Sequence, residues 1–194
     1  MKEILEPAEA LHEVNRSKFI AHLVPAAAFK SVRNNLKADH PKASHIAWGI
    51  RYLNEQGQIV EDFSDDGEPK GCAGMPILQV MRGHGLIDCA ILVVRYFGGI
   101  KLGTGGMARA YGEAAKKAVA AAMLRDYEKR RVLRFKTPYD QTRRWEYELS
   151  RAKELSAQKG YDESGVTWRV EGGESAIGGL AARLKEARIP FLLE

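Results

Sequence analysis

Hydrophobic and polar residues alternate along much of the first half of the chain, and a period of two residues is typical of half-buried strands. Residues 4–14 mix the two kinds and predict an edge strand, and residues 16–24 predict a better strand that Pro25 ends. Residues 26–39 place apolar side chains at helical spacing and predict a helix. Alternation returns in residues 44–53, which predict another half-buried strand.

The middle of the chain changes from alternation to longer apolar runs. Residues 58–63 predict a strand that returns after a turn, and residues 76–81 predict a short helix opened by a proline. Residues 88–96 are apolar almost throughout, as in a strand buried on both faces. The alanine-rich residues 107–124 predict a long helix.

Apolar patterning lapses near residues 126–131, where charged residues cluster, and this lapse predicts a domain boundary. We therefore expect two domains, residues 1–127 and 128–194, in a chain of the α+β class. The elements predicted beyond the boundary are strand 132–138, helix 140–156, strands 160–163 and 166–170, helix 174–187 and strand 189–193. This βαββαβ order is the pattern of ferredoxin-like domains.

Composition narrows the class of protein only moderately. The 194 residues carry a formal net charge of +5, which permits a nucleic-acid or ribosome partner without requiring one. Two cysteines are too few for a disulfide scaffold and match no zinc spacing. The N-terminal stretch carries acids, unlike a signal peptide, and the longest apolar run is too short to span a bilayer. We therefore expect a cytoplasmic protein with no membrane partner.

The segment 95–112, RYFGGIKLGTGGMARAYG, is the densest candidate site, with five glycines between residues 98 and 106. Glycines let a ligand or another backbone approach closely, and the amides at the start of the following helix favour an anion. The candidate nucleic-acid or anion-binding residues are Lys18, Arg95, Lys101, Thr104, Gly105, Gly106 and Arg109, with Arg95, Lys101 and Arg109 as mobile positive charges. The alternative is a tight strand-to-helix connection without a ligand, since the spacing fits neither a Walker loop nor a dinucleotide fingerprint.

A second candidate is the acidic segment 62–68, in which Asp62, Ser64, Asp65, Asp66 and Glu68 lie close together. These side chains suit a solvated turn or structural anion partner, a Mg²⁺ site, a general base, or a docking surface for a protein. No catalytic residue, resident metal or cofactor is assigned from the sequence. We expect the loop 64–74 and the segment 95–106 to share a cleft, because they lie on consecutive elements. Structural or site-orienting roles are expected for His45, Tyr96, Gly98 and Gly99.

Basic and aromatic residues are interleaved near the domain boundary, as suits RNA phosphates and stacked bases. The basic residues are Lys129, Arg130, Arg131, Arg134, Lys136, Arg143 and Arg144, and the aromatic ones are Tyr127, Tyr139 and Trp145. The alternative is an ordinary solvated helix face with charged side chains whose stems cover apolar surface.

Several motifs together resemble the IMPACT family, in its bacterial YigZ-like form. They are SKF at 17–19, HxAW at 45–48, SDDGEPxGxAGxP at 64–76 and RYFGGxxLGxGG at 95–106, followed by Ala110-Tyr111. The resemblance implies an N-terminal domain with the two-layer α/β fold of a small-subunit ribosomal protein and elongation factor G. It also implies a ferredoxin-like second domain similar to the C-terminal domain of that factor. Eukaryotic relatives regulate translation.

Residues and resemblance together predict a non-enzymatic, translation-associated regulator that binds RNA or the ribosome through the glycine-rich anion site. Two alternatives stay open. One is an enzyme or binder acting on a small phosphorylated or peptide substrate, with the acids facing the glycine segment. The other is a protein–protein adaptor that docks through the acidic loop.

Overall fold

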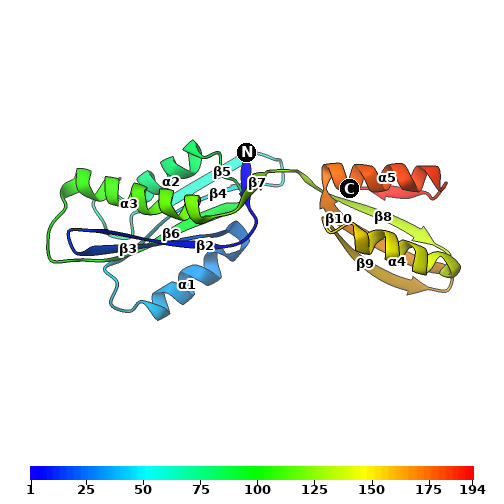
Figure 1. The fold of residues 1–194 in the computed structure, drawn as a ribbon, viewed down its shortest axis with the longest axis horizontal. Helices are drawn as coiled ribbons and strands as arrows, with labels where there is room; N and C mark the ends of the chain where they lie inside the picture. The colour runs from blue at the N-terminus through cyan, green and yellow to red at the C-terminus, as the bar shows by residue number, and fades with distance from the viewer. The chain divides into compact units, whose positions relative to one another are not determined.

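The computed structural model describes residues 1–194 and divides them into two compact units, Met1–Tyr127 and Glu128–Glu194. Both units combine helices with sheets, so the protein is of mixed α and β structure (Figure 1). None of its helices is long and apolar enough to cross a membrane.

The first unit is built on a five-stranded sheet with the strand order β2-β3-β6-β4-β5. All neighbouring strands pair antiparallel. The strands are β2 (Ala8–Val14), β3 (Ser17–Pro25), β4 (His45–Leu53), β5 (Ile59–Ser64) and β6 (Cys89–Tyr96). The central strand β6 is buried almost along its full length, as its continuous apolar run predicts.

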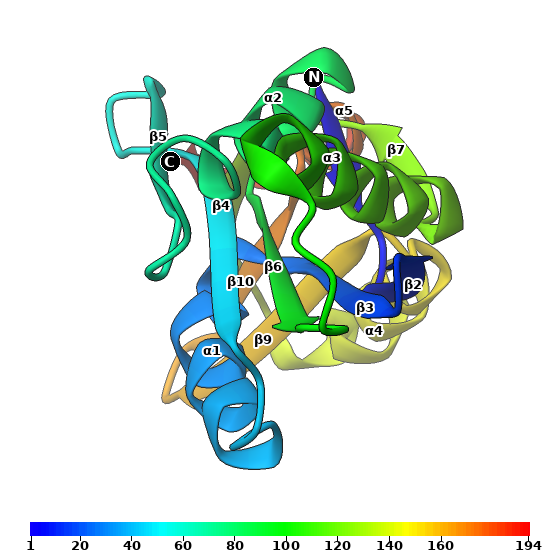
Figure 2. The same ribbon diagram turned by 90° about the vertical axis from the view of Figure 1, so that its left-hand side faces the viewer.

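Helices cover this sheet on both faces (Figure 2). Helices α2 (Gly74–Gly83) and α3 (Gly103–Ala121) pack on one face, against a core that includes Phe19, Ala21 and Ile91. The short η1 (Ala26–Ala28) and helix α1 (Phe29–Asp39) pack on the other face, against Trp48 and Leu92 among others. The alternation along β4 explains this division, because successive side chains of a strand point to opposite faces.

The first stretch of the chain differs from its prediction as one edge strand. It forms two strands, β1 (Lys2–Ile4) and β2, of which β1 pairs antiparallel with β7 (Leu124–Asp126). Pro7 lies between β1 and β2, and proline cannot donate a hydrogen bond to a strand ladder. The N-terminal strand thus joins the last strand of the same unit.

Helices α2 and α3 also begin earlier than the sequence predicts. Helix α3 starts at Gly103 rather than at residue 107, so three glycines lie in its first turn despite their low helix propensity. Its packing face, which includes the buried Ala110, Tyr111 and Ala114, supplies the stability that propensity does not. Helix α2 starts two residues before Pro76, which is tolerated because first-turn amides need no helical partner.

The second unit has a four-stranded antiparallel sheet with the order β11-β8-β10-β9. Its elements are β8 (Arg130–Thr137), η2 (Tyr139–Gln141), α4 (Thr142–Arg151), β9 (Leu155–Asp162), β10 (Gly165–Gly173), α5 (Glu174–Glu186) and β11 (Phe191–Leu193). Both helices pack on the core that contains Phe135, Trp145 and Trp168. The predicted helix 140–156 is too long, because residues 155–162 pair with β10 as a strand instead.

Candidate functional site

A buried ion pair joins the two segments that the sequence singles out. Glu68 lies in residues 64–74, the acidic loop. It accepts hydrogen bonds from Arg95 on β6 and from the Tyr111 hydroxyl on α3, the latter at 2.8 Å. The Glu68 and Arg95 side chains are only 3% and 7% exposed. The acidic loop and the glycine-rich segment therefore meet in space, and they meet through a buried pair.

Aromatic and sulfur atoms complete the surroundings of Arg95. Its guanidinium carbon lies 5.5 Å from the ring centre of Phe19 and 5.7 Å from that of Phe97. Its Nη1 also lies 3.4 Å from the sulfur of Met107. This environment corrects the expectation that Arg95 is a mobile charge, because a buried, paired guanidinium is held in place.

Tyr111 is fully buried beside the same carboxylate. Burial raises the pKa of Tyr111 far above its ordinary value, and the negative charge of Glu68 adds to this effect. The hydroxyl therefore stays protonated and serves as a hydrogen-bond donor to Glu68. The sequence offers little sign of this role, since an apolar helix face is also what a purely structural tyrosine occupies.

His45 stands at the edge of this cluster, with a side chain that is 26% exposed. Its Nδ1 lies 2.8 Å from the carbonyl oxygen of Asp66, which can only accept, so Nδ1 carries a proton. Its Nε2 lies 3.8 Å from Glu68 Oε2. The Asp66 carboxylate in turn accepts a hydrogen bond from the backbone amide of Ile46 at 2.7 Å. His45 thus ties the acidic loop to the start of β4.

Asp65 closes the N-terminal end of helix α2. Its carboxylate accepts hydrogen bonds from the backbone amides of Gly71, Ala73 and Gly74 at 2.8, 3.0 and 2.9 Å. A carboxylate at this place satisfies amides that have no helical partner and interacts favourably with the helix dipole. Ser64 adds a turn bond, as its hydroxyl oxygen accepts from the amide of Asp66 at 3.1 Å.

The acidic loop is therefore engaged in internal structure. Asp65, Asp66 and Glu68 bind backbone amides, Arg95 or Tyr111. The structure contains no group of three or more His, Cys, Asp or Glu side chains that could hold a metal ion. The magnesium alternative is not supported at Asp65, Asp66 and Glu68, because these carboxylates are directed at protein donors.

Gly98 explains part of the glycine content of the second segment. A Cβ atom there would lie 2.1 Å from the carbonyl carbon of Arg16, so the two backbones touch. The amide of Gly98 donates to the hydroxyl of the buried Ser17 at 3.0 Å. Asn15 and Arg16 have φ values of 48° and 63° and form the two-residue turn between β2 and β3. The close approach is therefore to this hairpin of the same chain.

The remaining candidate residues lie on the surface around the start of α3. Lys101, Thr104, Gly105 and Arg109 are exposed, and Gly106 is half-buried. Helix α3 has no capping side chain and no acidic residue in its first turn. Neither Lys101 nor Arg109 forms an ion pair. Lys18, by contrast, pairs with Glu13 at 3.2 Å.

Two apolar residues of this surface were not singled out from the sequence. Phe97 and Ile100 are 50% and 45% exposed, on the connection between β6 and α3. Tyr96, at the end of β6, is turned to the other side, where its hydroxyl lies 2.7 Å from His40 Nδ1. An aromatic residue at the end of a buried strand is the signal that could have identified Phe97.

Three of the seven basic residues in the cluster near the domain boundary form ion pairs. Arg131, Arg134 and Lys136 form ion pairs with Glu174, Glu194 and Asp162. Trp145 is 2% exposed and packs against Phe135, so it is a core residue rather than a stacking surface for bases. Lys129, Arg130, Arg143 and Arg144 are exposed and form no ion pair, and Tyr139 is 52% exposed, so both interpretations of this cluster stay open.

Fold and site together define a two-unit protein of mixed α and β structure, with a buried Glu–Arg–Tyr cluster beside an exposed basic helix start. The chain belongs to the IMPACT family, because the Impact N-terminal domain model matches residues 15–119. This match confirms the resemblance seen in the motifs.

Several relatives carry the same family name, and a solved structure has a similar fold. The IMPACT family member YigZ of Escherichia coli (strain K12) is 40% identical over 118 residues, which are 58% of this chain and 57% of that protein. An IMPACT family member of Thermus thermophilus is 38% identical over 169 residues, covering 83% of this chain and 88% of its own. A crystal structure of a hypothetical protein is similar with a TM-score of 0.64 at 28% identity, over 99% of this chain and 95% of that one. The match to YigZ thus spans less than two thirds of that relative.

Proposed function

We propose that the protein is a translation-associated factor that binds RNA or the ribosome and is not an enzyme. The surface that would carry this binding is the start of α3, with Lys101, Thr104, Gly105, Gly106 and Arg109. The observation behind the proposal is that Lys101 and Arg109 are exposed and lack carboxylate partners. The biological context comes from membership of the family. It also comes from the role in translation that the sequence resemblance implies for eukaryotic relatives.

Phosphate groups are the chemical partner that suits this surface. Lysine and arginine neutralise backbone phosphates, and first-turn amides without a capping side chain add donors for an anion. The exposed ring of Phe97 offers a face on which a base of single-stranded RNA can stack. Arg95 is absent from this contact set, because its guanidinium is buried against Glu68.

The finer fold assignments belong to the same proposal. The first unit would have the two-layer fold of the ribosomal protein and elongation factor G that the family resemblance implies, and the second would be ferredoxin-like. The element order β8-α4-β9-β10-α5-β11 with antiparallel pairing supports the latter. A cytoplasmic location follows from the translation role.

The alternatives have less support in the geometry. A catalytic or docking role for the acidic loop requires free carboxylates, whereas Asp65, Asp66 and Glu68 are bound to protein donors.

The proposal is tested by measuring binding to ribosomes and structured RNA over a range of salt concentrations. In the double variant Lys101→Ala/Arg109→Ala we expect weaker binding and a plot of log K against log salt that is flatter by about 1.5, because two phosphate contacts are lost. Lys37→Ala/Lys42→Ala is the matched control, since both lysines are exposed and the same charge is removed. Equal binding by both double variants would exclude this surface as the contact site.

A further inference from the structure

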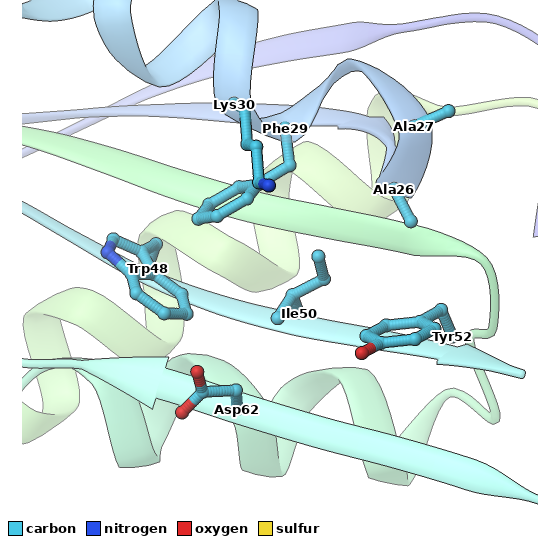
Figure 3. Close-up of a pocket in the computed structure, with 8 residues that line it drawn as sticks. All are labelled: Ala26, Ala27, Phe29, Lys30, Trp48, Ile50, Tyr52 and Asp62. Atoms are coloured by element: carbon cyan, nitrogen blue, oxygen red, sulfur yellow. The ribbon is translucent and has the colours of Figure 1, made fainter. Parts of the chain in front are cut away.

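A hollow lies on the α1 side of the first unit's sheet, between the start of α1 and strands β4 and β5 (Figure 3). Its volume is about 540 Å³, within the roughly 300–1,000 Å³ of small-molecule sites. The helix start discussed above belongs to α3, which packs on the opposite face of the sheet. The hollow is therefore a separate candidate site, independent of the proposed RNA contact.

The floor of the hollow is a row of apolar side chains on one strand. Trp48, Ile50 and Tyr52 are alternate residues of β4, so all three point to the same face. Ala26 and Ala27 border the hollow with side chains too small to fill it. Of the three floor residues, Tyr52 is the one that reaches solvent to a substantial extent.

The aromatic rings of this site are held in place by packing. Phe29 meets Trp48 edge to face, with ring centres 4.8 Å apart and planes at 61°. Trp48 and Ile50 are each only 8% exposed, while Tyr52 is 36% exposed at the open end of the row. An apolar surface held in place in this way favours an aromatic ligand, because little side-chain freedom is lost on binding.

Two opposite charges flank the row, one on each side, and the guanidinium carbon of Arg33 lies 5.6 Å from the ring centre of Trp48. Lys30 extends from α1 above it, and Asp62 stands on β5 below it, directly across from Ile50 in the strand register. Neither side chain forms an ion pair. One carboxylate oxygen of Asp62 accepts a hydrogen bond from the backbone amide of Phe63 at 2.8 Å, and the other oxygen has no hydrogen-bond partner. A complementary ligand therefore carries an anionic group at one end and hydrogen-bond donors at the other.

We propose that this hollow binds a guanine mononucleotide. The base would lie against the row of Trp48, Ile50 and Tyr52 with its hydrogen-bond donors facing Asp62, and the phosphate of the nucleotide would lie at Lys30. Guanine presents two adjacent donors, N1–H and the N2 amino group, to a carboxylate. Adenine would place its N1 acceptor against that carboxylate, which is repulsive. A free aromatic amino acid carries its ammonium and carboxylate on one carbon, so it cannot reach both sides of the row.

The test is calorimetric titration of the full chain with GMP, AMP and guanosine. We expect saturable binding of GMP and weaker binding of AMP. Guanosine should also bind more weakly than GMP, because it has no phosphate to contact Lys30. Asp62→Asn should remove the preference for GMP over AMP, because an amide can face either base. Lys30→Ala should weaken GMP binding about tenfold and leave guanosine binding unchanged.

The matched control is Lys37→Ala, which removes an exposed charge from the same helix and should change neither ligand's affinity. Circular dichroism of each variant verifies that it is folded, and both Lys30 and Asp62 are exposed, so folding is expected. Absence of saturable GMP binding at millimolar concentration would overturn the proposal. So would binding only to guanine-containing oligonucleotides, or equal GMP affinity in the wild type, Asp62→Asn and Lys30→Ala.

Discussion

Charged side chains of the first unit fall into two groups that differ in burial. Glu68 and Arg95 are buried together and hold three segments of the fold, whereas Lys101 and Arg109 face solvent without partners. Removing one member of a buried pair leaves the other charge uncompensated, while removing an exposed charge costs little folding free energy. The same residue type therefore has a structural role at position 95 and a candidate binding role at position 109.

This difference predicts opposite results for two arginine variants. Arg95→Ala should lower the free energy of unfolding by about 3–5 kcal/mol, because it leaves the Glu68 carboxylate buried without its cation. Arg109→Ala, at an exposed position, should change it by less than about 0.5 kcal/mol. Urea unfolding followed by circular dichroism measures both. Similar small losses in the two variants would show that the buried pair does not stabilise the fold.

A half-buried histidine predicts that acid destabilises the protein. Burial lowers the pKa of His22 below its ordinary value of 6.5, although Glu9 opposes this shift. The unfolded chain therefore takes up a proton near pH 6.5 that the folded chain does not, so stability falls as the pH drops below that value.

The measurement for His22 is the free energy of unfolding between pH 7 and pH 5. We expect the wild type to lose stability over this interval and His22→Gln to show a smaller loss. His84→Gln, at an exposed position, serves as the control. A slope in His22→Gln as steep as in the wild type would contradict the assignment to His22.

At the level of elements, the hydrophobic pattern predicted most of the strands and helices that pack against a core. Residues 44–53 alternate, and β4 occupies His45–Leu53, but the prediction of a half-buried strand was wrong because helices on both faces bury residues 46–51 throughout. Strand β9 lacks such a pattern, because seven of its eight residues are exposed on an edge strand, and the preceding helix was therefore predicted too long. The partners of Glu68 were also beyond the sequence, since they lie 27 and 43 residues away and only tertiary packing joins them.

Two glycines, Gly98 in the connection after β6 and Gly112 in the middle of α3, give a prediction for these elements. Gly98→Ala should destabilise the protein by more than about 2 kcal/mol, because its Cβ would overlap the backbone of the β2–β3 turn. Gly112→Ala should be neutral or stabilise by up to about 1 kcal/mol, since no atom lies within 4 Å and alanine favours helix. Thermal unfolding of the two variants compares them directly. A stable Gly98→Ala protein would mean that the hairpin can move away from this residue.

On the scale of the whole molecule, each unit has a core of its own. The first unit buries clusters on both faces of its sheet, and the second buries Leu133, Phe135, Trp145 and Trp168 with other apolar residues. The boundary between the units at residues 127 and 128 lies in the stretch where charged residues interrupt the apolar pattern. A separate core is what a unit needs to fold by itself.

The expected outcome is that residues 128–194 fold when produced alone. Near-ultraviolet circular dichroism should show fixed aromatic environments for Trp145 and Trp168, and thermal unfolding should be cooperative. Trp168→Ala in the same fragment, which removes a side chain only 2% exposed, should abolish the cooperative transition. A fragment with no near-ultraviolet signal would show that the second unit depends on the first.

The pairing of β1 with β7 has a mechanical consequence. Lys2 lies opposite Asp126 and Ile4 opposite Leu124, so the first and last strands of the first unit end side by side. A force that pulls on these two ends, such as that of an unfolding motor, first loads the backbone hydrogen bond from Tyr127 to Met1 and the adjacent Lys2–Asp126 pair. The rungs of this pair then separate one after another, and the backbone hydrogen bonds of Lys2 to Gly85 and Ile87 are loaded together with the first of them. The unit should therefore yield at low force from its ends while its central strand β6 stays protected.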